Sequence, residues 1–289
     1  MNKLAGVVVT YYPDKQELEK NIHSYLRSLD ILYVIDNTDK DDPVLAVAIK
    51  SISSKIVYIA NRKNTGIGAA LNKAAAAALR GGYTWLLAMD QDSYFQDEQL
   101  VLYQKTFLTS FFHRTDVAAL APSYVKEKHL EPAGTGAHKE VKAVITSGSL
   151  INLEIWNRLK GFEEKLFIDE VDHEYCYRAI HEGYHVILLP DIYFEHSLGT
   201  TRQAGYFGPI ARKNRRVYPA ARVYFMVRNY LYVRKKYKAI FPEEFKERDK
   251  HLLTLLKNNL LFSGHFWKSL RSILKGYRDF KKNEFSFKL

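Results

Sequence analysis

The feature that most constrains the fold is the alternation, over the first 90 residues, of short apolar runs with longer helix-like segments. The apolar runs are Val7–Tyr11, Leu32–Ile35, Ile56–Ala60 and Trp85–Met89. Each run is apolar throughout, which is typical of parallel strands buried on both faces. The helix-like segments between them are Gln16–Ser28, Pro43–Ser51 and Ile67–Arg80. Repeated strand–helix–strand units predict an α/β fold with a doubly wound sheet.

Polar residues lie at the carboxyl end of each of the four predicted strands or directly after it. They are Thr10 and Tyr12, Asp36 and Asn37, Asn61 and Asn64, and finally Asp90 and Asp92. Because the carboxyl ends of parallel strands meet at one edge of a sheet, these side chains are expected to line a common cleft. We therefore expect the ligand at this edge.

Two carboxylates occur in the motif Asp90-Gln91-Asp92, directly after a buried apolar run. Carboxylates one residue apart at a strand end can face a common divalent cation, which can in turn bridge two phosphate oxygens. A solvated acidic turn is the alternative. The apolar run before the motif and the matching strand ends favour the metal site.

The loop Asn64-Thr65-Gly66-Ile67-Gly68 leads into a predicted helix whose first turn contains no acid. Free backbone amides at a helix N-terminus suit a phosphate group. The loop does not fit the dinucleotide-binding fingerprint, because Leu71 stands at the third glycine position. Alone, it indicates a phosphate site only weakly.

Acidic residues open the helix predicted over Asp169–Glu182. At helical spacing Asp169, Asp172 and His173 fall on one face. Acids in a first turn often serve only to stabilise the helix dipole. A carboxylate on a helix that enters the cleft can instead act as a general base.

Histidines occur in two places where they could bind a metal. The segment His181-Glu182-Gly183-Tyr184-His185 matches the zinc-protease motif in letters, but Gly183 is expected to end the helix that the motif requires. We therefore reject zinc there. His196 follows a strand-like run and is either structural or a contact to a metal or a leaving group.

The rest of the chain gives coarser expectations. Ala143–Asn152 and His185–Leu189 are predicted strands, and Leu153–Leu159 a short helix. From about Val217 the chain is helical and basic, with breaks at Pro242 and Gly264.

The distribution of charge and the cysteine content indicate the kind of partner and the cellular compartment. The net charge is +11, but residues 205–289 hold 21 Lys and Arg against 6 Asp and Glu, which favours an anionic partner for this part of the chain. The single cysteine, Cys176, excludes an internal disulfide framework and fits a reducing compartment. No signal peptide or membrane span is expected, so we predict a cytoplasmic protein.

Residues 264–282 repeat apolar side chains at helical spacing, with basic residues largely between them. Such a helix can lie on an anionic membrane, or pack on the body of the protein or on a second subunit. We favour the membrane, at the inner face of the cell membrane. A homodimer stays open.

Several segments, in this order, resemble family 2 glycosyltransferases of the GT-A fold, and the whole is most similar to bacterial rhamnosyltransferases. The matching pieces run from residue 4 to about residue 235. They are Val7-Val8-Val9-Thr10-Tyr11-Tyr12-Pro13, Val34-Ile35-Asp36-Asn37, Asn64 to Asn72, Leu87 to Asp92, Thr146-Ser147-Gly148-Ser149-Leu150-Ile151, Gly161-Phe162-Glu163-Glu164, Phe167 to Arg178, His196-Ser197-Leu198-Gly199 and Arg228-Asn229.

The resemblance implies a role for individual positions. Thr10, Tyr12 and Asp36 would line the nucleoside pocket, and Asn64 and Gly66 would lie near the ribose and diphosphate. Asp90, Asp92 and His196 would hold Mg²⁺ or Mn²⁺, Asp172 would be the general base, and Ser147 and Gly148 would border the acceptor. Further substrate contacts are expected at Asn37, Gln91, Asp169 and Arg228.

The resemblance also implies the reaction and the partners. We expect a GT-A domain over residues 1–215 and a basic helical region over residues 216–289. The predicted activity is inverting transfer of a sugar, L-rhamnose from dTDP-rhamnose, to a hydroxyl of a glycan or lipid-diphosphate-linked saccharide. The alternatives are a sugar-1-phosphate nucleotidyltransferase and a non-enzymatic basic protein that binds RNA or lipid; nucleic acid is not the expected partner. The nucleotidyltransferase would carry a glycine-rich basic loop after the first strand, where Thr10-Tyr11-Tyr12-Pro13-Asp14 stands instead.

Overall fold

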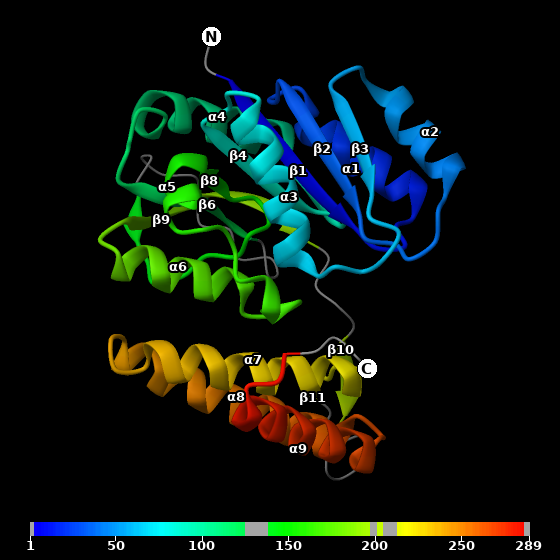
Figure 1. Cartoon of the computed structure of the whole chain (residues 1–289), viewed down its shortest axis with the longest axis vertical. Helices are drawn as coiled ribbons and strands as arrows, with labels where there is room; N and C mark the ends of the chain where they lie inside the picture. The colour runs from blue at the N-terminus through cyan, green and yellow to red at the C-terminus, as the bar shows by residue number, and fades with distance from the viewer. Residues whose placement is uncertain (1–2, 125–137, 197–200, 205–212, 286–289) are drawn as a thin grey trace. The chain divides into compact units, whose positions relative to one another are not determined.

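The structure is a computed structural model that describes residues 3–124, 138–196, 201–204 and 213–285. The chain divides into two compact units. Unit 1 comprises residues up to Glu164 together with Val171–Ser197, and unit 2 comprises Lys165–Glu170 together with residues from Leu198 onward. Figure 1 shows the helices and strands of both units, coloured from the N-terminus to the C-terminus. The domain limits expected from the sequence, 1–215 and 216–289, stay a prediction.

Unit 1 is built on a mixed sheet. Its described strands are β1 (Leu4–Thr10), β2 (Ile31–Asp36), β3 (Ile56–Ala60), β4 (Trp85–Asp90), β5 (Ser93–Tyr94), β6 (Val117–Tyr124), β7 (Lys139–Glu140), β8 (Leu150–Asn152) and β9 (His185–His196). Their order is β3-β2-β1-β4-β8-β6-β9-β5, with β7 beside β9. The first four strands are parallel, as the apolar runs predict, and β8 runs antiparallel between β4 and β6.

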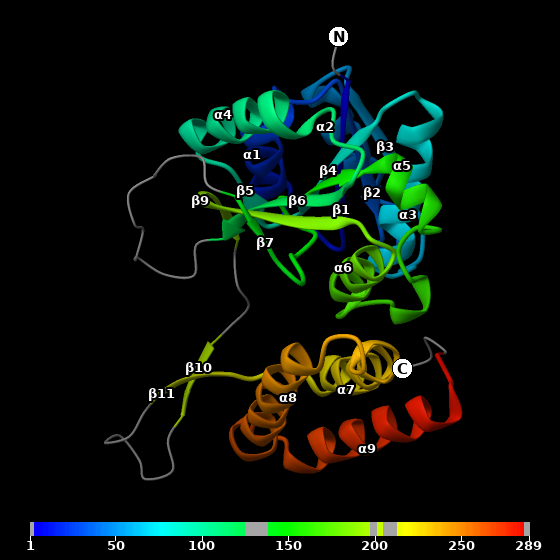
Figure 2. The same ribbon diagram turned by 90° about the vertical axis from the view of Figure 1, so that its left-hand side faces the viewer.

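Helices cover both faces of this sheet (Figure 2). They are α1 (Lys15–Leu26), α2 (Pro43–Ile52), α3 (Ile67–Arg80), α4 (Asp97–Thr106), α5 (Leu153–Arg158) and α6 (Val171–His181). Side chains of α1, α2 and α4 share one core with the strands, while α3, α5 and α6 pack elsewhere on the sheet. Asp14 and Asp42 cap α1 and α2 by accepting a backbone N–H, which satisfies donors that a helix start leaves open. The doubly wound α/β fold predicted from the sequence is confirmed.

Three predicted elements differ from the structure. The strand predicted over Ala143–Asn152 begins only at Leu150, because a turn at Thr146–Ser149 precedes it. The helix predicted from Asp169 begins at Val171, since Asp169 and Glu170 have φ values of 60° and 69°. The expected sharing of one helical face by Asp169 and Asp172 is therefore wrong. The strand predicted over His185–Leu189 continues to His196.

The rejection of the zinc-protease reading is confirmed. Gly183 has a φ of +86° and ends the helical path, so His181 closes α6 while His185 opens β9. The two imidazoles thus belong to different elements and do not project from one helix face, which that motif requires.

Unit 2 is mainly helical in the part of the chain that is described. It contains β10 (Thr201–Ala204) paired antiparallel with β11 (Lys213–Arg216), followed by α7 (Ala220–Tyr237), α8 (Pro242–Phe262) and α9 (Phe266–Lys282). The breaks expected at Pro242 and Gly264 are where α8 begins and where α8 gives way to α9. No helix within the described ranges combines the length and apolarity needed to cross a membrane.

Candidate active site

The carboxyl ends of β1, β2 and β3 are joined by side-chain hydrogen bonds. The Thr10 hydroxyl donates to Oδ1 of Asp36 at 3.2 Å, and the Asn61 amide donates to Oδ1 of Asn37 at 2.8 Å. The Asn37 amide donates in turn to the carbonyl of Gly66, just before α3, at 3.2 Å. The predicted strand ends therefore form one polar edge.

Asp36 is buried at the centre of this edge, with 1% of its surface exposed. Oδ1 accepts from the Thr38 amide at 2.9 Å as well as from Thr10, and Oδ2 accepts from the Tyr58 hydroxyl at 2.5 Å. Burial and the bond to Asp36 raise the pKa of Tyr58, so that the phenol stays a donor. These three hydrogen bonds fix the orientation of the Asp36 carboxylate. A nucleobase that contacted it would form a further hydrogen bond to an oxygen that already accepts at least one.

Tyr12 lies at the rim of the same edge and is about half exposed. Its backbone amide donates to the Thr38 hydroxyl at 3.0 Å, and its phenol donates to Asp39. That hydrogen bond raises the pKa of Tyr12 to about 12. The exposed ring packs edge-on against Tyr11, with ring centroids 4.8 Å apart. Two exposed rings at a strand end can provide a stacking surface for a planar base.

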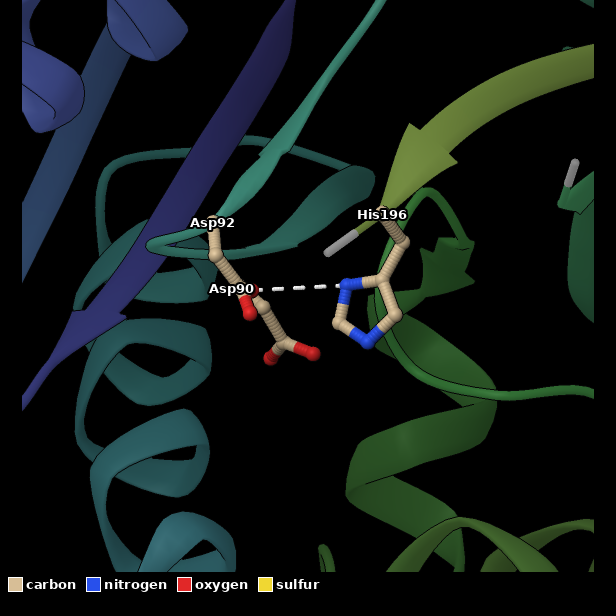
Figure 3. Close-up of side chains that lie close together, drawn as sticks. All are labelled: Asp90, Asp92 and His196. Carbon is tan, nitrogen blue, oxygen red and sulfur yellow. Dashed lines mark ion pairs between the residues drawn. The ribbon is translucent and has the colours of Figure 1, made fainter. Parts of the chain in front are cut away.

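Asp90, Asp92 and His196 converge on one point (Figure 3). One ligand atom from each, two carboxylate oxygens and an imidazole nitrogen, lie within 4.8 Å of one another. Nδ1 of His196 is 3.4 Å from Oδ1 of Asp92. Two carboxylates and an imidazole are suitable ligands for a divalent cation such as Mg²⁺ or Mn²⁺. The donor set therefore fits the metal that the sequence predicts.

Strand pairing explains why His196 reaches a motif more than 100 positions earlier. The short strand β5 follows Asp92 directly and pairs antiparallel with the end of β9, so that Ser93 lies opposite His196. The Ser93 hydroxyl is 2.7 Å from Nδ1 of His196. The histidine is thus positioned by backbone pairing and by a neighbouring side chain.

Ser93 is a site residue that sequence reasoning missed. It is fully buried, and its hydroxyl accepts from the Ser147 hydroxyl at 2.9 Å. The Ser147 hydroxyl accepts in turn from the backbone amide of Asp90 at 3.0 Å. The chain His196–Ser93–Ser147–Asp90 therefore holds the predicted metal ligands together, and such supporting contacts tune a metal site. Serine after an acidic pair carries no pattern of its own that would reveal this role.

Gln91 and Asn64 are bonded within the protein at this edge. Oε1 of Gln91 accepts from the Tyr11 amide at 2.7 Å, which ties the acidic turn to β1. Oδ1 of Asn64 accepts from the amide of Gly66 at 3.0 Å. Gly66 has a φ of +83° and precedes α3 without a side-chain cap, so the first turn of α3 keeps amides for a ligand, as expected. Substrate contacts by Gln91, Asn64 and Gly66 stay predictions.

Asp172, the predicted general base, is the second residue of α6. Its Oδ1 accepts from the backbone amide of His173 at 2.8 Å and lies 3.0 Å from Nδ1 of the same residue, and 21% of its side chain is exposed. The helix packs on β6 and β9 and turns directly into β9, so it runs opposite to that strand. Its first turn therefore points toward the edge at which the parallel strands end.

Asp169 and Arg228 belong to unit 2 and are not brought together with the metal ligands within one unit. Asp169 pairs with Arg222 at 3.0 Å. Arg228 is fully buried, and its guanidinium donates to the carbonyls of Lys165 and Leu166 at 3.3 and 3.4 Å. These bonds give Arg228 a structural role, and the substrate contacts predicted for both residues stay predictions. Ser197, Leu198 and Gly199, which follow His196 in the motif, lie outside the described residues.

Comparison with known proteins shows which protein family has a similar sequence around this site. Residues 6–110 match the model of the family described as Glycosyl transferase family 2. This part of the chain is similar to a family 2 glycosyltransferase domain. Its relatives include the dTDP-rhamnosyl transferase RfbF of Shigella flexneri, which is 26% identical over 243 residues, or 78% of this chain and 80% of the relative. The family 2 match spans β1 to α4 and therefore contains the acidic motif.

Two solved structures share the GT-A fold with this chain. One is GalNAc-T7 with UDP, GalNAc and Mn²⁺, with a TM-score of 0.59 and 13% identity over 98% of this chain. This chain spans just over half, 56%, of that protein's length. The other is the mannosyltransferase PcManGT from Pyrobaculum calidifontis in complex with GDP-Man and Mn²⁺, with a TM-score of 0.54 and 12% identity over 99% of this chain and 76% of its own. The GT-A-type α/β fold is thereby confirmed.

Gly148 of the glycosyltransferase site is expected to tolerate no side chain. It has a φ of +77°, and an added Cβ would lie 2.9 Å from the buried ring of Phe194. We expect Gly148→Ala to lower the free energy of unfolding by about 2–4 kcal/mol, measured by urea denaturation. Gly82→Ala is the matched control, because Gly82 has the same φ with nothing within 4 Å of the added atom. That control should lose only about 1 kcal/mol; equal losses would rule out the steric cause.

Proposed function

We propose that this glycosyltransferase moves L-rhamnose from dTDP-rhamnose to a hydroxyl of a glycan or lipid-linked saccharide, with inversion and with a divalent cation. The observation that carries the proposal is the convergence of Asp90, Asp92 and His196 beside the polar edge of a family 2 domain. The similarity to a dTDP-rhamnosyl transferase supports the choice of donor. The cytoplasm is the proposed location, in keeping with the single thiol.

The donor would lie across the ends of β1 to β4. The exposed ring of Tyr12, with Thr10, Asp36 and Asn37 behind it, would bind the nucleoside. Asn64, Gly66 and Gln91 would lie along the ribose and diphosphate. A cation held by Asp90, Asp92 and His196 would supply positive charge against the diphosphate. This arrangement leaves the sugar near Ser147 and Gly148, where the acceptor is proposed to approach.

The acceptor would be activated by Asp172. Its carboxylate takes the proton of the acceptor hydroxyl while the oxygen forms a bond to the anomeric carbon. The bond from that carbon to the diphosphate oxygen breaks in the same step, so the nucleoside diphosphate leaves with the electron pair. One displacement from the opposite face inverts the anomeric centre.

A thermal-shift panel of nucleotide sugars with and without Mn²⁺ tests the proposed donor. A ligand at 100 times its Kd stabilises the folded state by about 2.7 kcal/mol. We expect dTDP-rhamnose with Mn²⁺ to raise Tm more than UDP-glucose, UDP-GalNAc or GDP-mannose, and to do little without the metal. A larger shift with another donor, or an equal shift without Mn²⁺, would contradict the proposal.

A further inference from the structure

Unit 2 exposes large apolar side chains in an unusual concentration. Among the described residues, half of the exposed large apolar side chains lie in the last 50 positions of the chain. They are Ile240, Leu253, Leu261, Phe266, Trp267, Leu274 and Tyr277. Most exposed apolar residues of a soluble surface are scattered singly, whereas a cluster marks a binding surface.

The helix α9 does not use its apolar side chains to pack on α7. Its buried residues are the small or polar Ser269, Gly276 and Asp279. An added Cβ at Gly276 would lie 2.8 Å from the backbone oxygen of Tyr224, so the two helices approach closely at this glycine. Asp279 accepts from the Tyr224 hydroxyl at 3.0 Å. The packed face of α9 is therefore separate from most of its apolar stripe.

The apolar stripe of α9 is turned to solvent instead. The exposed fractions are 44% for Phe266, 70% for Trp267, 58% for Leu274 and 50% for Tyr277. Spaced at positions i, i+1, i+8 and i+11, these side chains fall on one side of a helix with 3.6 residues per turn. Packing on α7 within unit 2 therefore does not account for this stripe.

Basic side chains border the apolar stripe. Lys268, Arg271 and Lys282 are exposed and follow one another at helical spacing beside it. The region from residue 205 onward carries 21 Lys and Arg against 6 Asp and Glu. An apolar stripe edged by positive charge complements a surface of negative headgroups over hydrocarbon, which is an anionic bilayer.

The turn between α8 and α9 extends this surface. Leu261 near the end of α8 and Phe266 and Trp267 at the start of α9 are exposed within seven residues of chain. Tryptophan is favoured at the level of lipid headgroups. We propose that unit 2 binds the surface of an anionic lipid bilayer through the exposed face of α9 and the end of α8. This inference does not depend on the donor or on the chemistry of the metal site.

Tryptophan fluorescence of the full chain offers a direct test with lipid vesicles. The chain has three tryptophans, and Trp85 and Trp156 are buried, so a change in polarity around Trp267 dominates the response. With vesicles of equal phosphatidylglycerol and phosphatidylcholine, we expect a blue shift and co-sedimentation. Vesicles of phosphatidylcholine alone should bind at least about tenfold more weakly.

Two double variants test the basic and the apolar side chains of this surface separately. Lys268→Glu with Arg271→Glu should weaken binding to anionic vesicles at least about tenfold, and so should Phe266→Ser with Leu274→Ser. The matched control is Val44→Ser with Val47→Ser, which removes two exposed apolar side chains of α2 in unit 1. It should bind as the parent does. Circular dichroism melting shows that each variant is folded.

Three results would overturn the proposal. One is equal binding to neutral and anionic vesicles, and another is unchanged binding by both α9 variants. The third is sedimentation velocity that shows a dimer of the parent, lost in Phe266→Ser with Leu274→Ser, without any binding to vesicles. That third result would assign the surface to a second copy of the chain.

Discussion

Asp92→Asn is expected to lower sugar transfer by at least about 100-fold and to remove its response to Mn²⁺. Asp92 contributes one of the two carboxylates that converge with His196. The amide has nearly the same shape but carries no charge, so the site keeps its packing while it loses affinity for a divalent cation. The measurement is the initial rate of transfer over a Mn²⁺ titration, with donor at saturation.

Asp97→Asn is the control for this change. Asp97 stands in the first turn of α4, five residues away, and forms a surface ion pair with Arg27 at 3.1 Å with 76% of its own side chain exposed. Exposed pairs of this kind contribute about 0–1 kcal/mol to stability. Its transfer rate and Mn²⁺ response should match those of the parent. If Asp92→Asn also retains both, the proposed cation site is wrong.

Asp172→Asn is expected to lower the transfer rate by about 10²–10⁴-fold while the donor binds as before. The asparagine oxygen can still accept the hydrogen bond that the His173 amide gives to Oδ1 of Asp172, so the first turn of α6 should stay folded. What is lost is the ability to take a proton from the acceptor. The rate is measured with saturating acceptor, and donor affinity by calorimetric titration in the presence of Mn²⁺.

Asp169→Asn tests whether Asp169, the other acid near the start of α6, acts as the base in place of Asp172. Asp169 lies three positions before Asp172, outside the helix, and its carboxylate is paired with Arg222. We expect this variant to lose less than about tenfold in transfer rate, in keeping with a binding contact and a partly exposed ion pair. A full loss in Asp169→Asn together with a normal rate in Asp172→Asn would reverse the assignment.

The parallel half of the sheet could be predicted because its strands are apolar throughout. The strand β1 (Leu4–Thr10) is buried throughout, as its apolar composition predicts. The prediction of full burial is wrong for β3 (Ile56–Ala60), because β3 lies at the edge of the sheet and exposes Val57 and Ala60. The acidic motif was found for a related reason, because Asp90 and Asp92 directly follow one of those strands. Local sequence therefore located the edge of the sheet that carries the site.

The remaining parts depend on contacts that are distant in sequence. His196 reaches Asp92 only because β5 pairs with the end of β9, and no local pattern records that pairing. Ser93 owes its role to the same pairing and to Ser147. The predicted start of α6 at Asp169 was wrong for another reason. Asp169 and Glu170 have positive φ values, and an acidic side chain does not indicate such a backbone conformation.

Anomalous X-ray scattering from crystals grown with Mn²⁺ and dTDP tests the cation site most directly. We predict a single strong manganese peak in unit 1, between Asp90, Asp92 and His196 and about 2.0–2.3 Å from its ligand atoms there, with diphosphate oxygens in the remaining coordination positions. A nucleotide bound at the strand ends without manganese between these side chains, or manganese bound elsewhere on the chain, would contradict the account.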